Sequence, residues 1–124
     1  MSEKKPLILC VDDDADLLEA IKLRLEHAGY RINTAITAEE GLRSFQAEKP
    51  DFIIVDLMME EIDSGTALVK DLSLAGNRAP IFMLSSTGDQ LNLAVDYQGL
   101  GLGGVFQKPV NFDLLIKTIK ARLG

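Results

Sequence analysis

The sequence predicts an α/β fold in which five parallel strands, in the order 2-1-3-4-5, carry helices on both faces of the sheet. Apolar runs rich in valine, isoleucine, leucine and phenylalanine alternate with segments of helical periodicity, which is typical of β-α units wound into a parallel sheet. The length of 124 residues allows one domain with a hydrophobic core but not two. We therefore expect a single domain over residues 1–124.

The candidate strands are the five apolar runs that begin near Leu7, Arg31, Phe52, Ile81 and Gly104. Right-handed crossovers leave few ways to wind five such units, and the common one is the doubly wound, flavodoxin-like arrangement. In that arrangement the first and third strands are neighbours, and the direction of winding reverses between them. Ligands bind at this switch point, at the carboxyl ends of the strands.

The first two helical patterns carry clear end signals. The first has an apolar face within residues 17–28 and is followed by Gly29, which suits a left-handed cap. The second opens with Thr37 and Glu40 at the spacing of a capping box and stops before Pro50. Both segments therefore have defined ends.

Three further helices are expected towards the carboxyl terminus. The third covers about Thr66–Leu74. The fourth starts after Asp89 and runs into four glycines between Gly99 and Gly104. The fifth begins at Asn111 as its N-cap and has an apolar face made of Phe112, Leu115, Ile119 and Leu123.

Acidic, hydroxyl and amino groups stand at the ends of four predicted strands, at Asp12 and Asp13, Asp56, Ser85 and Lys108. Any one of them is most simply a turn residue, a helix cap or a solvated surface group. Because the carboxyl ends of parallel strands meet at one edge, we expect all five side chains to converge there. Their joint occurrence favours a functional site.

A cluster of three carboxylates requires a compensating positive charge. Oxygen ligands without histidine or cysteine select a hard cation such as Mg²⁺. Asp12, Asp14 and Asp16 have the spacing of a calcium loop, but Leu17 and Leu23 occupy the glycine and glutamate positions that an EF-hand needs. We therefore expect magnesium rather than an EF-hand.

Composition and charge exclude several other classes of protein. The net charge is −6 without a clustered lysine or arginine stripe, which argues against nucleic-acid binding. The amino terminus has too short an apolar stretch for a signal peptide or membrane span, so we expect a cytoplasmic protein. Cys10, the single cysteine, is expected to be buried. His27, the single histidine, lies at the expected end of a helix, which argues against a Ser-His-Asp triad.

Four segments of the chain, in order, resemble the receiver domain of two-component response regulators of the chemotaxis type. "LILCVDDDADLL" is similar to the acidic first loop of that family, and "DFIIVDLMM" is similar to its phosphoacceptor strand. "APIFMLSSTGD" is similar to the strand that ends in serine or threonine, and "FQKPVNFDLL" to the Lys-Pro segment. The resemblance covers the whole chain.

The resemblance implies that Asp56 accepts a phosphoryl group from a phosphohistidine of a sensor kinase. It implies that Asp13 and Asp56 bind Mg²⁺ directly, that Asp12 binds it through water, and that the backbone carbonyl of Met58 is a further ligand. Ser85 and Lys108 would then contact the phosphoryl oxygens.

The implied partners are a sensor histidine kinase or phosphotransfer protein and a downstream protein effector, without direct contact to nucleic acid or membrane. The chain would be a regulator rather than an enzyme, although it would catalyse its own phosphorylation and dephosphorylation. Asp14, the third acid of the first loop, is expected either to cap a helix or simply to be solvated.

The chain departs from the family pattern at two places. Val105 stands where the family usually has an aromatic residue, and Phe106 is expected to face the opposite side of the sheet and join the core. After the phosphoacceptor strand, Glu60 replaces a common proline, and the family's glycine arrives one place late as Gly65. The coupling between site and surface is therefore expected to differ.

Two other functions remain open from the sequence. The first is a receiver-like binding module that docks partners without being phosphorylated, and Val105 keeps this alternative open. The second is a magnesium-dependent phosphatase of the haloacid dehalogenase type, which needs a second aspartate two residues after the nucleophile. Met58 occupies that position, so this alternative ranks last.

Overall fold

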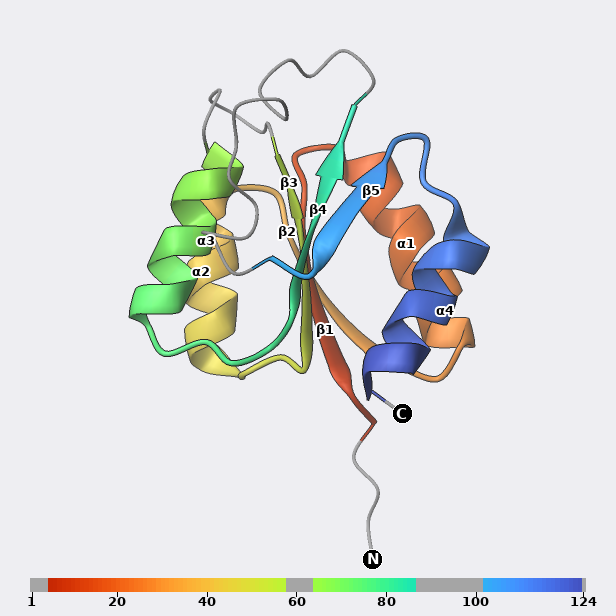
Figure 1. The fold of residues 1–124 in the computed structure, drawn as a ribbon, viewed down its shortest axis with the longest axis horizontal. Helices are drawn as coiled ribbons and strands as arrows, with labels where there is room; N and C mark the ends of the chain where they lie inside the picture. Colours follow the sequence, from red (N-terminus) through yellow and green to blue (C-terminus); the bar gives the residue numbers. More distant parts are fainter. Residues whose placement is uncertain (1–4, 58–63, 87–101, 124) are drawn as a thin grey trace, which may run out of the picture.

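The computed structural model describes residues 5–57, 64–86 and 102–123. These residues form a five-stranded parallel sheet in the order β2-β1-β3-β4-β5, which confirms the predicted fold (Figure 1). Each strand begins at the residue that the sequence predicts. The strands are β1 (Leu7–Val11), β2 (Arg31–Ala35), β3 (Phe52–Asp56), β4 (Ile81–Ser85) and β5 (Gly104–Gln107).

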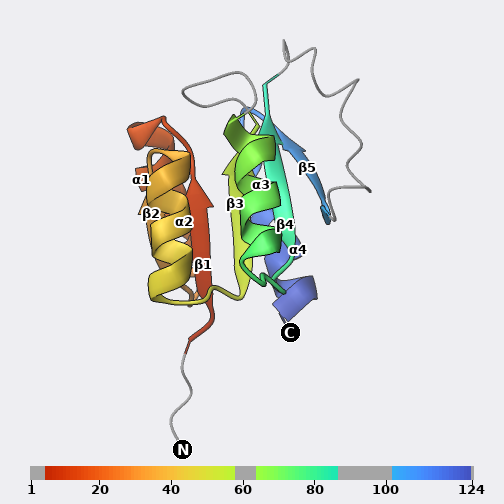
Figure 2. The same ribbon diagram turned by 90° about the vertical axis from the view of Figure 1, so that its left-hand side faces the viewer.

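The helices within the described residues are α1 (Ala15–His27), α2 (Ala38–Ala47), α3 (Ser64–Leu74) and α4 (Phe112–Leu123). Helices α1 and α4 cover one face of the sheet, and α2 and α3 cover the other (Figures 1 and 2). Helix α3 begins two residues before the predicted start at Thr66. The helix expected after Asp89 falls in residues 87–101, outside the described part, so α4 corresponds to the fifth predicted helix. No helix of the described residues has the length and apolarity needed to cross a membrane.

The central strands are apolar up to their last residues because both faces of the sheet are covered. All residues of β1, β3 and β4 are buried, whereas the edge strands β2 and β5 alternate between buried and more exposed positions. Successive side chains enter the two cores in turn. In β1, for example, Ile8 and Cys10 face α1 and α4, while Leu9 and Val11 face α2 and α3.

Side-chain caps fix the starts of three helices. Asp14, Thr37 and Asn111 each accept a hydrogen bond from the backbone N–H three residues later, which confirms their expected role as N-caps. Gly29 and Gly76, after α1 and α3, have φ values of 102° and 91°, which strongly favour glycine. The ends of these helices are thus determined locally.

Helix α2 packs closely on β1 through Gly41. A Cβ atom at Gly41 would lie 2.8 Å from Cγ2 of Val11 and 3.3 Å from Cδ2 of Leu68. Both neighbours are buried, and the branched Val11 side chain has little freedom to turn away. Since Val11 directly precedes Asp12, this contact also supports the carboxyl end of β1.

We predict that Gly41→Ala destabilises the fold. Overpacking costs about 1–3 kcal/mol, and the better helix propensity of alanine offsets about 1 kcal/mol of that cost. Urea unfolding should show a lower free energy of unfolding. The double variant Val11→Ala/Gly41→Ala should lose less than the sum of the two single losses, because the smaller side chain makes room for the new methyl group. A Gly41→Ala protein as stable as the parent would contradict the proposed close contact.

We also predict that Asp14→Ala lowers the free energy of unfolding by about 1 kcal/mol, because α1 loses its N-cap. Asp14→Asn keeps a side-chain oxygen that can accept the same hydrogen bond, so it should retain most of the stability. Thermal unfolding of the two variants side by side checks this expectation. Equal losses in both variants would show that charge, rather than capping, is the contribution of Asp14.

Candidate functional site

The sheet ladder continues past the strand ends and fixes the residues that follow them. The N–H of Asp12 donates to the carbonyl of Ala35 at 3.0 Å, and the N–H of Lys108 donates to the carbonyl of Ser85 at 2.7 Å. Asp56 is itself the last residue of β3. The backbone under each of these side chains is therefore held in register with a neighbouring strand.

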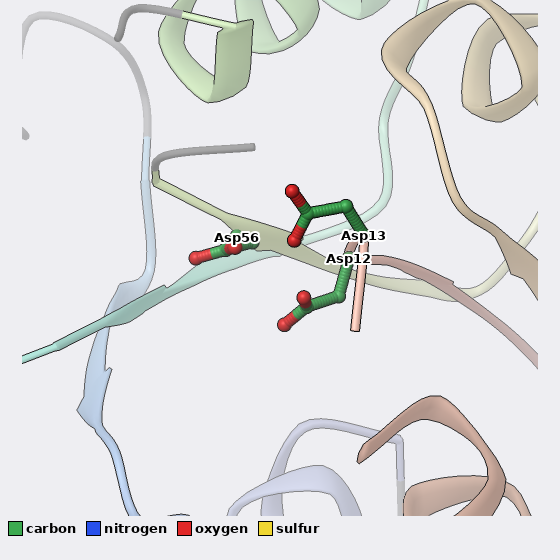
Figure 3. A group of neighbouring side chains, drawn as sticks. All are labelled: Asp12, Asp13 and Asp56. Carbon is green, nitrogen blue, oxygen red and sulfur yellow. The ribbon is translucent and has the colours of Figure 1, made fainter. Parts of the chain in front are cut away.

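Three carboxylates gather at the carboxyl ends of β1 and β3 (Figure 3). One oxygen each from Asp12, Asp13 and Asp56 lies within 4.8 Å of the others. Asp12 is fully buried and Asp56 is 3% exposed, whereas Asp13 is exposed. Because like charges in a buried site repel strongly, this cluster needs a positive partner.

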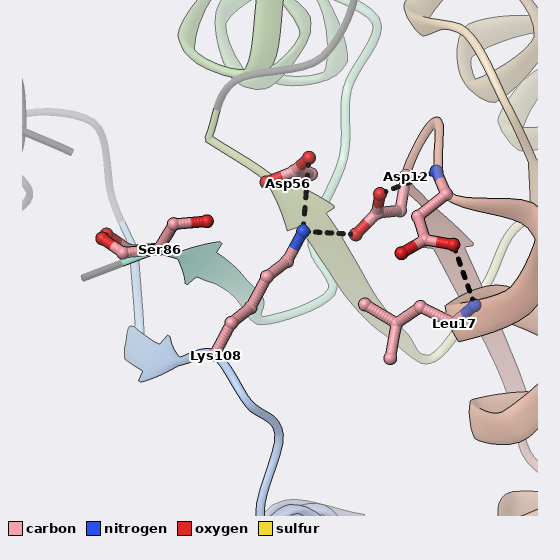
Figure 4. A network of polar contacts seen from close by, with 7 residues as sticks. Asp12, Leu17, Asp56, Ser86 and Lys108 are labelled. Carbon is pink, nitrogen blue, oxygen red and sulfur yellow. Dashed lines mark hydrogen bonds and ion pairs between the residues drawn. The ribbon is translucent and has the colours of Figure 1, made fainter. Parts of the chain in front are cut away.

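Lys108 supplies one positive charge from the end of β5. Its Nζ atom lies 3.1 Å from Oδ2 of Asp12 and 3.5 Å from Oδ2 of Asp56 (Figure 4). Burial disfavours the charged lysine, but contacts with the two carboxylates outweigh burial and raise its pKa above the ordinary value. The ammonium therefore stays charged at neutral pH. The stability that it contributes is lost only as the pH rises through that raised pKa.

The two carboxylate oxygens of Asp12 have different neighbours. Its Oδ1 atom accepts a hydrogen bond from the N–H of Asp14 at 2.9 Å. Its Oδ2 atom is buried and has no hydrogen-bond partner of acceptable geometry, although Lys108 lies within ion-pair distance. An anionic, oxygen-only cluster with a buried oxygen left unbonded fits a hard cation such as Mg²⁺. Met58, whose carbonyl is expected to be a further ligand, lies outside the described residues.

Two adjacent serines end β4 beside this cluster. Ser85 is fully buried, and its hydroxyl donates to the carbonyl of Ser86 at 3.4 Å. Ser86 lines a cavity of about 510 Å³ next to Lys108, and Figure 4 shows the two residues side by side. Sequence reasoning selected Ser85 and missed Ser86, although the serine pair in "LSST" was a visible signal.

The other polar residues considered from the sequence have roles outside the cluster of three carboxylates. Asp14 caps α1 and is not part of the cluster of three carboxylates. His27 is the last residue of α1, as expected. Cys10 is fully buried, and burial first, then the charges of Asp12 and Asp56, raises the pKa of its thiol. That thiol is therefore protonated and chemically inert.

Val105 and Phe106, which stand three and two places before Lys108, face opposite sides of the sheet, as predicted. Phe106 is 7% exposed and stacks on Phe82 at 5.3 Å between ring centroids, and Phe82 stacks on Phe52 at 5.1 Å. Val105 is 36% exposed on the other face. The aromatic ring at this end of β5 thus belongs to the core, and the outward position carries only a small aliphatic side chain.

Comparison with known proteins identifies the family. A family model described as the response regulator receiver domain matches residues 8–120. The chain is 37% identical over 119 residues to the transcriptional regulatory protein GlrR of Escherichia coli, covering 96% of this chain and 26% of that protein. It is 32% identical over 116 residues to the alkaline phosphatase synthesis transcriptional regulatory protein PhoP of Bacillus subtilis, covering 94% of this chain and 48% of that protein. The chain thus spans about a quarter to a half of the length of these relatives.

Solved structures agree with this match. A CheY-like response regulator receiver domain protein from Methanospirillum hungatei has a TM-score of 0.86 at 30% identity, over 98% of this chain and 94% of its own. The chemotaxis response regulator CheY4 of Vibrio cholerae has a TM-score of 0.84 at 29% identity, over 97% of this chain and 100% of its own. The chain belongs to the response regulator receiver domain family.

Proposed function

We propose that this receiver domain is a phosphorylation-dependent switch of a two-component system and that Asp56 is its phosphoacceptor. The single observation that supports this most directly is the setting of Asp56. Its carboxylate ends a buried strand, lies among two other carboxylates and has the ammonium of Lys108 at 3.5 Å. Such a carboxylate is held in place and faces a positive charge on the side where an incoming phosphoryl group would carry its negative oxygens.

The proposed reaction is a transfer from a phosphohistidine of a sensor kinase or phosphotransfer protein. A carboxylate oxygen of Asp56 forms a bond to phosphorus while the phosphorus–nitrogen bond to histidine breaks, and the electron pair stays on the imidazole. Phosphoryl transfer depends on alignment and charge neutralisation more than on acid-base chemistry. Lys108 would pair with one oxygen of the transferred group, and Ser85 would donate a hydrogen bond to another after its hydroxyl turns from Ser86.

Asp12, Asp13 and Asp56, together with the carbonyl of Met58, are the proposed holders of Mg²⁺. The ion would supply the charge that lets the carboxylate and the phosphoryl group, both anionic, approach each other. Asp12 and Asp56 are buried and pre-positioned, whereas the exposed Asp13 can adjust its side chain. This division leaves one flexible ligand in a site that is otherwise fixed.

Phosphorylation would replace one carboxylate charge by a group with more negative charge and more acceptor oxygens. Lys108 would then be drawn from Asp12 towards the phosphoryl group, and the segment that carries it would shift with it. A small bias of this kind changes the populations of two conformations. The output would be altered binding to a downstream protein effector, without direct contact between this chain and nucleic acid or membrane.

A receiver-like binding module that works without phosphorylation is the second candidate. The observation that favours it is Val105, because the outward position near the end of β5 has no aromatic ring to report on Ser85. The two candidates differ in whether Asp56 reacts. In the phosphorylation-dependent switch Asp56 gains and loses a phosphoryl group, and in the docking module it does not. The two candidates are therefore separable by chemistry at that one residue.

We predict that incubation with Mg²⁺ and a small acyl-phosphate donor adds one labile phosphoryl group, because Asp56 is aligned and charge-compensated. Intact-protein mass spectrometry checks this expectation. The adduct should be absent in Asp56→Asn and when the metal is chelated. Asp113→Asn, which removes an exposed carboxylate on α4, is the matched control and should react normally. An adduct that persists in Asp56→Asn would mean that another residue is the acceptor.

We predict that Lys108→Ala still binds Mg²⁺, because the three carboxylates remain, but loses most of its conformational response. The measurement is the change in amide chemical shifts between the unphosphorylated and phosphorylated protein. Lys117→Ala, which removes an exposed lysine on α4, should keep both binding and response. Loss of the folded spectrum in Lys108→Ala would instead assign this lysine a structural role.

A further inference from the structure

A second feature of the molecule lies at the end of the sheet away from the carboxylate cluster. There the turn between α3 and β4 and the carboxyl end of α4 lie near the starts of the strands (Figures 1 and 2). Two cavities of about 470 Å³ and 230 Å³ flank this turn. Both are lined by Asn77, Arg78 and Ala79, so Arg78 stands on the boundary between them.

The lining of these two cavities is positively charged and contains no acid. Arg78 and Arg122 line the larger cavity, and Lys49 and Arg78 line the smaller. Aspartate and glutamate make up 19 of the 124 residues, yet none lines either cavity. Within the described part of the chain, these three cations take part in no ion pair, whereas Arg24, Arg31 and Lys108 do.

Ring contacts position two of these cations, and hydrogen bonds of the turn hold the backbone that carries the third, Arg78. The guanidinium of Arg122 lies 5.2 Å from the centroid of the Phe82 ring, and the ammonium of Lys49 lies 4.0 Å from that of Phe45. The turn that carries Arg78 is tied by two hydrogen bonds between the Asn77 amide and the backbone of Ala79, at 2.9 Å and 3.0 Å. Ring stacking leaves the N–H groups of a guanidinium available in its plane.

Helix dipoles explain part of this pattern. Two of the cations follow the end of a helix, Lys49 after α2 and Arg78 after α3, and Arg122 lies in the last turn of α4. The partial negative charge at the carboxyl end of a helix favours cations there. The helix dipoles account for the positive sign of these charges. They do not explain why the cations are grouped around two neighbouring cavities that no aspartate or glutamate lines. Hollows of a few hundred Å³ with a few fixed polar groups are typical of small-ligand sites.

We propose that these two cavities bind a small soluble anion that carries a diphosphate group. Arg78 and Arg122 would each contact phosphoryl oxygens through paired N–H donors, a geometry for which guanidinium is suited. Lys49 would contact the part of the anion that extends past Arg78 into the smaller cavity. This site is separate from Asp56 and does not depend on phosphorylation there.

The test is a titration of the ¹⁵N-labelled protein with pyrophosphate, followed by amide chemical shifts, in EDTA and without Mg²⁺. Removal of divalent ions keeps the anion from binding at the carboxylate cluster through a metal. We expect saturable shifts of Gly76, Asn77 and Ala79. Arg78→Ala, a change at an exposed residue, should weaken binding at least about tenfold, since it removes charge-assisted hydrogen bonds to the anion.

Three further variants control this experiment. Arg122→Lys keeps the charge but loses the planar fork, and it should also weaken binding. Arg43→Ala removes an exposed arginine of α2 that lines neither cavity, and it should leave affinity unchanged. Asp56→Asn should bind as the parent does, which separates this site from the phosphoacceptor. Equal weakening by Arg43→Ala and Arg78→Ala would overturn the proposal, because it would show diffuse attraction only.

Two other anions complete the test. If ADP binds more tightly than pyrophosphate, the result would support the proposal and identify the ligand as a nucleotide. If ADP and pyrophosphate bind with equal affinity, the result would support the proposal and show that the diphosphate group alone is recognised. Sulfate that binds as tightly as pyrophosphate would overturn it, as would the absence of saturable shifts up to millimolar pyrophosphate.

Discussion

The contact of Lys108 with Asp12 and Asp56 is the interaction on which the site depends. Two nearly buried carboxylates at the end of adjacent strands repel each other, and a lysine from a third strand lies 3.1 Å and 3.5 Å from them. A buried charge left without its partner is costly, so the positions of the three side chains are coupled. We therefore expect an added charge at Asp56 to change where Lys108 lies. The same contacts that stabilise the unmodified site make it responsive to modification.

The sheet makes this arrangement possible because its strands carry no functional group until they end. Each central strand is buried on both faces and apolar up to its last residue, and the first polar side chain follows or ends the strand. The close approach of Gly41 to Val11 and the cap at Asp14 hold the loop between them from both sides. The rigidity of the site thus comes from ordinary packing and capping around it.

Periodic features and the convergence of the strand ends could be predicted from the sequence, and detailed side-chain packing between distant residues could not. Apolar runs located the strand starts, and Asn111 marked a helix cap because its signal is local. Helix α3 starts at Ser64 and not at the predicted Thr66, although Asp63 and Ser64 are residue types that favour helix starts. The gathering of Asp12, Asp56 and Lys108 followed from strand order alone. The fit of Gly41 against Val11, the position of Ser86 beside Lys108 and the grouping of Arg78 with Arg122 depend on three-dimensional packing that no local pattern encodes.

The parallel topology also gives the molecule two ends of opposite character. Every helix that follows a strand begins near the carboxyl ends of the strands and finishes at the other end, so the helix dipoles point the same way. Their amino ends lie on the side of Asp12, Asp13 and Asp56 and favour negative charge there (Figure 1). Their carboxyl ends favour the cations at Lys49, Arg78 and Arg122. The cluster of three carboxylates and these three cations thus lie at opposite ends of one small domain of net charge −6.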